Sequence, residues 1–179
     1  MLATLEKVLA PIGPTGGETP VADTIRALIG DKADETYTDV MGNLALIKKG
    51  KEGGKRILFS AHMDHIGFIV TDIEKDGFLR VMPLGGIGLN VSLTRHVKFQ
   101  NGVDGVLAAQ PVKPGDTLAM KNMFIDIGAS SKEEALKMVN IGDSAVYAPD
   151  FFRLGEHRVA SPAMDDRCAC ALLVKLFAQ

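Results

Sequence analysis

The chain has 179 residues, of which 46% are apolar and 23% charged, and its 20 Lys and Arg against 22 Asp and Glu leave a net charge of −2. This composition is typical of a soluble globular protein and excludes the disordered and fibrous classes. A near-neutral charge without a basic run argues against nucleic-acid binding, and the longest uncharged stretch, residues 81–94, is too short and too rich in Gly and Pro to cross a bilayer.

The N-terminus does not resemble a secretory signal, because Glu6 stands where an apolar segment should begin and no basic segment precedes it. The two cysteines, Cys168 and Cys170, lie too close in sequence to pair with each other. Free thiols and the absence of a leader predict a cytoplasmic protein.

In chain order, the first elements are two helices and two strands. Residues 2–10 and 18–29 have apolar side chains at helical spacing, which predicts amphipathic helices. Residues 43–48 and 56–61 are predicted strands on either side of a Gly-rich, basic turn.

From residue 67 onward, short apolar runs alternate with Gly, Pro and Asp, a pattern typical of a small barrel or sandwich. A helix at 133–139 interrupts them, beginning at the capping box of Ser131 and Glu134, and a last helix is predicted at 166–178. The predicted strands are residues 67–73, 78–82, 96–101, 103–108, 117–119, 124–127 and 142–148. The simplest partition is an α/β domain over residues 1–66, an inserted β-rich module over 67–160, and a return to the α/β domain over 161–179.

His62 and Asp64 follow the apolar strand predicted at 56–61, at the end where open α/β sheets bind ligands. Residues two apart in an extended chain point the same way, so the carboxylate can orient the imidazole as it does in metal-bound histidines. The alternative is a His and an Asp that only satisfy each other's hydrogen bonds at a strand end. Spacing alone leaves both interpretations open.

Asp165 and Asp166 stand before the last predicted helix. Adjacent carboxylates can bind a cation, but Asp is also favoured at helix starts through capping and the helix macrodipole, so both explanations remain open. His96 and His157 have no acidic or Cys partner at ligand spacing and are predicted to be ordinary surface or strand residues.

Six short motifs follow one another along the chain: Pro14-Thr15-Gly16-Gly17-Glu18, Gly42-Asn43-Leu44, Ala61-His62-Met63-Asp64, Leu84-Gly85-Gly86-Ile87, Ile125-Asp126-Ile127-Gly128-Ala129 and Met164-Asp165-Asp166-Arg167. In this order they resemble the metal-dependent aminopeptidases of the glutamyl-aminopeptidase, deblocking-aminopeptidase and tetrahedral-aminopeptidase family. Some members of that family are labelled cellulase-M endoglucanase. The resemblance extends over essentially the whole chain and implies an α/β zinc-peptidase catalytic domain interrupted by a small β-barrel that serves in assembly.

The resemblance also implies roles for single residues. His62 would be a ligand of one metal, Asp64 the catalytic carboxylate that orients it, and Asp165 the carboxylate that bridges two divalent ions, zinc or cobalt. His65 replaces the Glu that commonly follows this motif in the family, and an imidazole there can alter metal affinity or the pH response.

A two-metal site needs more ligands than these, since zinc binds about four per ion. The family's Glu-Glu pair, which supplies the general base and a ligand, and its later Asp and His ligands are expected beyond Gln179. We therefore expect the N-terminal portion of an aminopeptidase that hydrolyses N-terminal residues from peptides by metal-activated water, inactive by itself.

Two other functions remain as alternatives. One is a non-enzymatic assembly module, in which the insert forms a homo-oligomer. The other is an endoglucanase, whose chemistry needs two carboxylates flanking a glycosidic bond and no His-x-Asp metal motif. The motifs favour the peptidase, with a peptide substrate, a homo-oligomer through the insert, and neither nucleic acid nor membrane as a partner.

Overall fold

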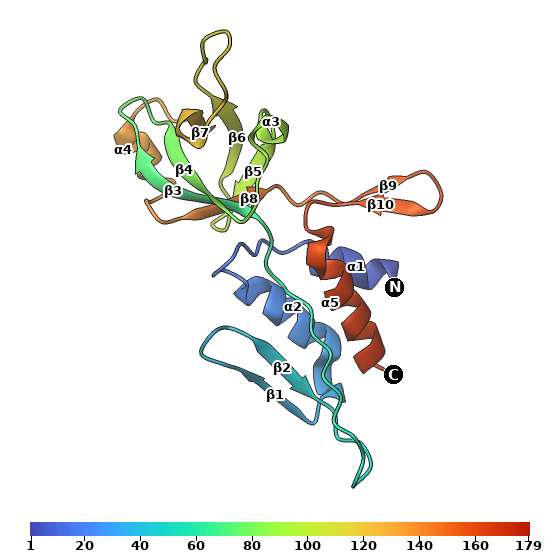
Figure 1. Cartoon of the computed structure of the whole chain (residues 1–179). Helices are drawn as coiled ribbons and strands as arrows, with labels where there is room; N and C mark the ends of the chain where they lie inside the picture. Colours follow the sequence, from blue (N-terminus) through green and yellow to red (C-terminus); the bar gives the residue numbers. More distant parts are fainter. The chain divides into compact units, whose positions relative to one another are not determined.

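The computed structural model describes residues 1–179 and divides into two compact units. The first unit comprises Met1–Asp64 and Asp150–Gln179, and the second comprises His65–Pro149 (Figure 1). The predicted fold class, an α/β unit interrupted by a small β-barrel, is confirmed. Residues 150–160, which the sequence analysis placed in the insert, form a hairpin within the first unit.

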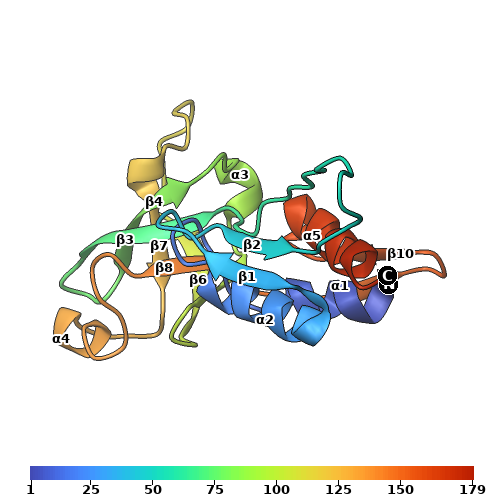
Figure 2. The same cartoon turned by 90° about the horizontal axis from the view of Figure 1, so that it is seen from below.

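Three helices build the first unit: α1 (Leu2–Leu9), α2 (Thr19–Ile29) and α5 (Met164–Phe177), with a short 3₁₀ turn at Gly30–Lys32. Each packs against the other two (Figures 1 and 2), and their apolar faces form one core. None of the helices of the chain combines the length and the apolar composition needed to span a bilayer. The buried members of this core include Val8, Leu9, Val21, Ile29, Ala171 and Val174.

The strands of the first unit form two separate antiparallel pairs, β1 (Glu35–Thr38) with β2 (Leu44–Ile47), and β9 (Phe152–Leu154) with β10 (Arg158–Ala160). Leu44 and Leu46 of β2 pack against the helical core. Each two-stranded pair is too small to be stable without such packing.

The strand predicted at residues 56–61 is wrong, because this segment has no strand partner. None of its residues makes a hydrogen bond within the chain. Ala61 packs against the core of the first unit, whereas Ile57, Leu58 and Phe59 are 73%, 89% and 59% exposed. An apolar run of this composition becomes a strand only when a neighbouring strand satisfies its amides and carbonyls.

The second unit is a closed six-stranded barrel in which neighbouring strands are antiparallel, in the order β3-β4-β7-β6-β5-β8. Its apolar core cluster contains Phe68, Phe99 and Leu107, all fully buried. Gly67 allows β3 and β8 to approach closely, because a Cβ there would lie 2.5 Å from the carbonyl oxygen of Ala145. The strands are β3 (Gly67–Ile73), β4 (Leu79–Leu84), β5 (His96–Phe99), β6 (Asp104–Ala109), β7 (Met123–Asp126) and β8 (Ser144–Tyr147).

Short helical segments connect the barrel strands: α3 (Leu89–Ser92), α4 (Lys132–Ala135) and a 3₁₀ turn at Met120–Asn122. Half of the predicted capping box is confirmed, since Oγ of Ser131 accepts a hydrogen bond from the amide of Glu134, whereas the carboxylate of Glu134 accepts from the amide of Ser130 and not of Ser131. The helix it begins is shorter than the predicted 133–139, and the strand predicted at 117–119 does not form.

Candidate functional site

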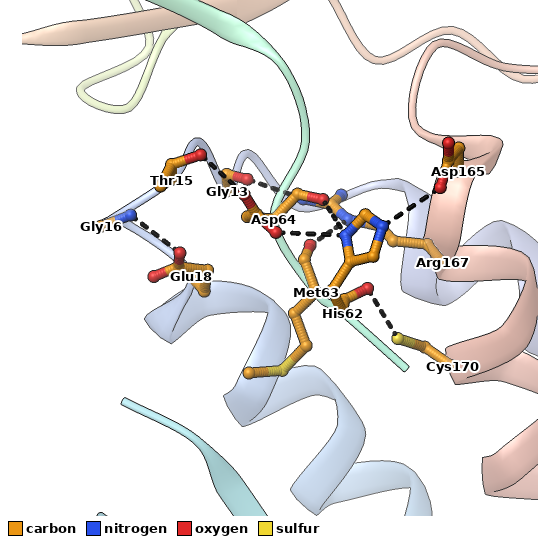
Figure 3. Close-up of polar contacts among 10 residues, drawn as sticks. All are labelled: Gly13, Thr15, Gly16, Glu18, His62, Met63, Asp64, Asp165, Arg167 and Cys170. Carbon is orange, nitrogen blue, oxygen red and sulfur yellow. Dashed lines mark hydrogen bonds and ion pairs between the residues drawn. The ribbon is translucent and has the colours of Figure 1, made fainter. Parts of the chain in front are cut away.

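The imidazole of His62 is held on one side by Asp64 (Figure 3). Its Nδ1 lies 3.1 Å from the main-chain oxygen of Asp64 and 3.1 Å from the carboxylate Oδ1 of the same residue. Both oxygens only accept hydrogen bonds, so Nδ1 must carry the proton. The contact between Asp64 and His62 is what both sequence interpretations require, so it does not by itself decide between metal binding and mutual hydrogen bonding.

The other ring nitrogen of His62 faces Asp165. Nε2 lies 3.1 Å from Oδ1 of Asp165, and that carboxylate makes no other hydrogen bond (Figure 3). With the proton on Nδ1, Nε2 of the neutral ring has a lone pair, and the carboxylate oxygen is also an electron-pair donor. Two such atoms attract each other only with a cation between them, either the second proton of an imidazolium or a metal ion.

The pKa of His62 is raised for the same reason. Burial of the ring opposes the charged form, but hydrogen bonds to the main chain of Asp64 and to Asp165, with the charges of both carboxylates, outweigh it. The site therefore attracts positive charge at Nε2.

Asp64 is itself fixed by a loop that precedes α2. Oγ1 of Thr15 donates a hydrogen bond of 2.6 Å to Oδ2 of Asp64, so the two carboxylate oxygens have different partners. The loop is closed by Glu18, whose Oε1 accepts from the amide of Gly16 at 2.7 Å (Figure 3). The motif at Pro14 to Glu18 thus places the hydroxyl of Thr15 against the carboxylate of Asp64.

Asp165 and Asp166 lie in the turn that begins α5, and the peptide bond between them is cis. Their backbone angles are not helical, and no side chain caps the helix at Ala163. The side chain of Asp165 is 95% exposed and contacts His62 in place of the first-turn amides. Capping, one of the two explanations left open for this carboxylate, is therefore not what the structure shows.

Two residues of α5 outside the predicted ligand set, Arg167 and Cys170, contact the segment around His62. The thiol of Cys170 donates a hydrogen bond of 3.2 Å to the main-chain oxygen of His62, and burial raises the pKa of this thiol to about 11, so it stays protonated. Nε of Arg167 donates to the main-chain oxygen of Met63 at 2.9 Å. Their spacing of three residues on one helix face is the only signal that sequence offers for these contacts.

His62 and Asp165 fit one side of a metal site. An imidazole nitrogen and a carboxylate oxygen are both donors that zinc accepts, and the proton on Nδ1 leaves Nε2 free for that purpose. No group of three or more His, Cys, Asp or Glu side chains gathers that could hold an ion by itself. The residues present could therefore supply at most part of a ligand set.

The prediction that His96 is an ordinary surface or strand residue is confirmed, because it is an exposed residue of β5 whose Nε2 lies 2.8 Å from Oδ1 of Asp104 on the neighbouring barrel strand. Lys98 contacts the same oxygen at 2.8 Å, so this is a surface charge cluster of the barrel. His157 contacts only Glu156, at 3.7 Å on the exposed hairpin.

Comparison with known proteins identifies a family for the larger part of the chain. The family model described as M42 glutamyl aminopeptidase matches residues 42–179. A putative aminopeptidase of Acetivibrio thermocellus is 43% identical over 98% of this chain and 52% of its own length. A lysyl aminopeptidase of Pyrococcus furiosus is 35% identical over 94% of this chain and 52% of its own length.

Solved structures give the same result. An aminopeptidase from Desulfurococcus kamchatkensis superposes with a TM-score of 0.91 at 36% identity, covering 98% of this chain and 50% of that protein. A protein described as an endoglucanase from Thermotoga maritima superposes with a TM-score of 0.87 at 36% identity, covering 97% of this chain and 53% of its own. The chain thus spans about half the length of the relatives it matches.

Proposed function

Since the chain belongs to the M42 glutamyl aminopeptidase family, we propose that it is part of a metal-dependent aminopeptidase that removes N-terminal residues from peptides. The observation that supports this most is the pair of electron-pair donors at the site, Nε2 of His62 and Oδ1 of Asp165, at a distance of 3.1 Å. A divalent cation, zinc or cobalt, would bind to both of these atoms.

In this proposal His62 would hold one ion through Nε2, and the carboxylate of Asp165 would be shared by two ions. When bound, such ions lower the pKa of a water molecule and polarise the scissile carbonyl. Asp64 keeps the proton of His62 on Nδ1, and Thr15 keeps Asp64 turned toward the ring. The chain's own residues thus hold the ligands in their metal-binding form before an ion arrives.

The remaining ligands and the general base belong, in this proposal, to the half of the family's fold that the chain does not span. The exposed apolar residues Ile57, Leu58 and Phe59 are where that half would pack, because their segment has neither strand partners nor a cover. Parallel sheets of α/β proteins are covered on both faces, and this segment has the apolar composition of such a strand.

The test compares the chain alone with a chimera in which it replaces the matching part of the Acetivibrio thermocellus protein. Aminoacyl p-nitroanilides with zinc or cobalt should give no turnover with the chain alone and measurable turnover with the chimera. His62→Ala and Asp165→Asn should abolish turnover by the chimera and lower its bound metal, whereas His157→Ala, on the exposed hairpin, should change neither. Full turnover by the 179-residue chain, or by the His62→Ala chimera, would refute the proposal.

Assembly is a further part of the proposal. A similar structure, the TET1 peptidase of Pyrococcus horikoshii, is described as assembling into a tetrahedron or a large octahedral shell, with a TM-score of 0.87 and 34% identity to this chain. We propose a homo-oligomer formed through the barrel unit, which light scattering of the chimera would detect.

The name of the Thermotoga maritima neighbour makes endoglucanase the second candidate. Glycoside hydrolysis needs two carboxylates that face each other across the bond, about 5 to 9.5 Å apart. Here Asp64 and Asp165 both contact a single imidazole, an arrangement that favours metal binding. Hydrolysis of carboxymethylcellulose by the chimera, retained in His62→Ala, would reverse this preference.

A further inference from the structure

We propose that Arg167 is the positioning residue of this site, joining the three chain segments that carry Thr15, His62 with Asp64, and Asp165. The identity of the metal ligands rests on the proposed function, whereas the contacts of Arg167 do not depend on it. Arg167 does not touch a substrate or an ion in this inference, and it acts only through the backbone.

Arg167 is the largest fully buried side chain of the protein, and it forms no ion pair. Burial lowers the pKa of its guanidinium to about 10, so the group remains charged at neutral pH. An unpaired buried charge is costly unless hydrogen bonds compensate it. Every hydrogen bond of this guanidinium goes to a main-chain carbonyl.

Its two Nη atoms hold the end of α1 and the loop that follows. Nη1 donates to the carbonyl oxygens of Pro11 at 2.5 Å, Leu9 at 3.4 Å and Val8 at 3.5 Å, and Nη2 donates to that of Gly13 at 3.3 Å. The last carbonyls of a helix have no partner within it, so the guanidinium satisfies groups that α1 leaves open. Gly13 lies two residues before Thr15, the donor to Asp64.

Its Nε holds the second segment, through the carbonyl oxygen of Met63 at 2.9 Å (Figure 3). Met63 lies between His62 and Asp64, so this hydrogen bond fixes the backbone from which both side chains project. Arg167 itself follows Asp165 by two residues. One side chain thus links the backbones of all the residues assigned to the site.

A Lys cannot replace this arrangement. The planar guanidinium presents five N–H groups in a fixed fork, whereas an ammonium has three donors around one nitrogen and cannot reach carbonyls on two sides at once. Arg167→Lys keeps the charge and removes the fork. Arg167→Met removes both while leaving a chain of similar length.

Gly13 offers an independent way to disturb the same contact. A Cβ at this position would lie 2.7 Å from Nη2 of Arg167 and 2.6 Å from Cγ2 of Val21, so Gly13→Ala must displace one of them. Gly50→Ala is the matched control in the same unit, because a Cβ there meets nothing within 4 Å.

The readout is the tautomer of His62, measured from the ¹⁵N shifts of its ring in the metal-free 179-residue chain at one alkaline pH, with His62→Ala to assign the signals. The wild-type ring should be protonated on Nδ1. Arg167→Lys, Arg167→Met and Gly13→Ala should shift it toward the mixture of free histidine, whereas Gly50→Ala and Lys175→Met, on the exposed face of α5, should not. A role in stability alone would leave the tautomer of a folded variant unchanged.

Circular dichroism decides which variants are folded and enter the comparison. A folded Arg167→Lys or Arg167→Met that keeps the wild-type tautomer would overturn the inference. If neither folds, Gly13→Ala decides, and a wild-type tautomer in that variant overturns it. In the chimera, Arg167→Lys should weaken zinc binding by about tenfold or more, the range for residues that orient ligands. Failure of the proposed function is a separate result, seen as metal binding and turnover that persist in the His62→Ala chimera.

Discussion

The two units of the chain differ in how completely their own residues satisfy the backbone hydrogen bonds and bury the apolar side chains. The barrel closes six strands on themselves and has no free edge. In the first unit, residues 55–61 make no hydrogen bond within the chain. Two phenylalanines show the contrast, since Phe68 in the barrel is fully buried and Phe59 is 59% exposed. The barrel pairs all of its strands within the chain, whereas the first unit leaves an apolar segment without a partner.

The largest expected effect compares these two side chains. Phe68→Ala should destabilise the barrel by about 3 to 5 kcal/mol, because it removes a buried ring and leaves a cavity next to Tyr147. Phe59→Ala in the same chain should change the free energy of unfolding by less than about 0.5 kcal/mol, as for other exposed positions. Equal losses in the two variants would mean that the two units do not differ in this way.

The measurement is urea unfolding. The chain has no Trp and two Tyr, one in each unit, so Tyr147 reports on the barrel and Tyr37 on the first unit. Replacing one Tyr by Phe at a time separates their fluorescence.

The second prediction concerns the exposed segment directly. Leu58→Ala should cost less than about 0.5 kcal/mol in the chain alone, where the side chain is exposed. In the chimera with the Acetivibrio thermocellus protein it should cost about 2 to 3 kcal/mol, the usual range for a Leu that has become buried. Val40→Ala, at a fully exposed turn position, is the control and should have a small effect in both proteins. The same small effect of Leu58→Ala in both would show that the other half packs elsewhere.

Sequence patterns predicted the barrel better than the first unit, for a physical reason. Every strand of the barrel finds its partners within the insert, so apolar runs separated by turn residues are sufficient to predict it, and β3 was predicted with its observed limits. The run at 56–61 has the same local pattern but no partner among the described residues. The strand predicted at 117–119 does not form either, and here the chain leads directly into a 3₁₀ turn that begins at Met120.

The site shows the same limit. Spacing placed His62 beside Asp64, since both lie on one short segment. The grouping of His62 with Asp165, 103 positions away, came only from the family resemblance. Arg167 could not be predicted as buried, because charged side chains are rarely found inside a protein. Asp104 was missed as the partner of His96 because it depends on the register of β5 and β6, which pairs His96 with Val106 and leaves Asp104 diagonally opposite.

A smaller effect is expected at the helix cap of the barrel unit. Ser131→Ala removes the oxygen that accepts from the amide of Glu134 at 3.2 Å and should cost about 1 kcal/mol. The loss should appear in the signal of Tyr147 and leave that of Tyr37 unchanged. Ser130→Ala is a suitable control, because Ser130 contributes only its main-chain amide, which donates a hydrogen bond to the carboxylate of Glu134. A transition of Tyr37 that moves as far as that of Tyr147 would show that the units unfold as one.

The smallest predicted effect is a pH dependence confined to the barrel. Hydrogen bonds from Lys98 and then His96 hold the pKa of Asp104 below its usual value. A carboxyl group with a depressed folded-state pKa stabilises the fold above its unfolded pKa, near 3.8, and loses that contribution as the pH falls through the folded value. Asp104→Asn should therefore lower the midpoint of the urea transition reported by Tyr147 slightly above about pH 5, with the difference shrinking as the pH falls below 3.8. Because the group is exposed, salt should screen the difference, and Asp116→Asn, in an exposed loop, should show none. A difference between wild type and Asp104→Asn that persists at low pH would mean that the substitution acts through the contacts of the side chain and not through its charge.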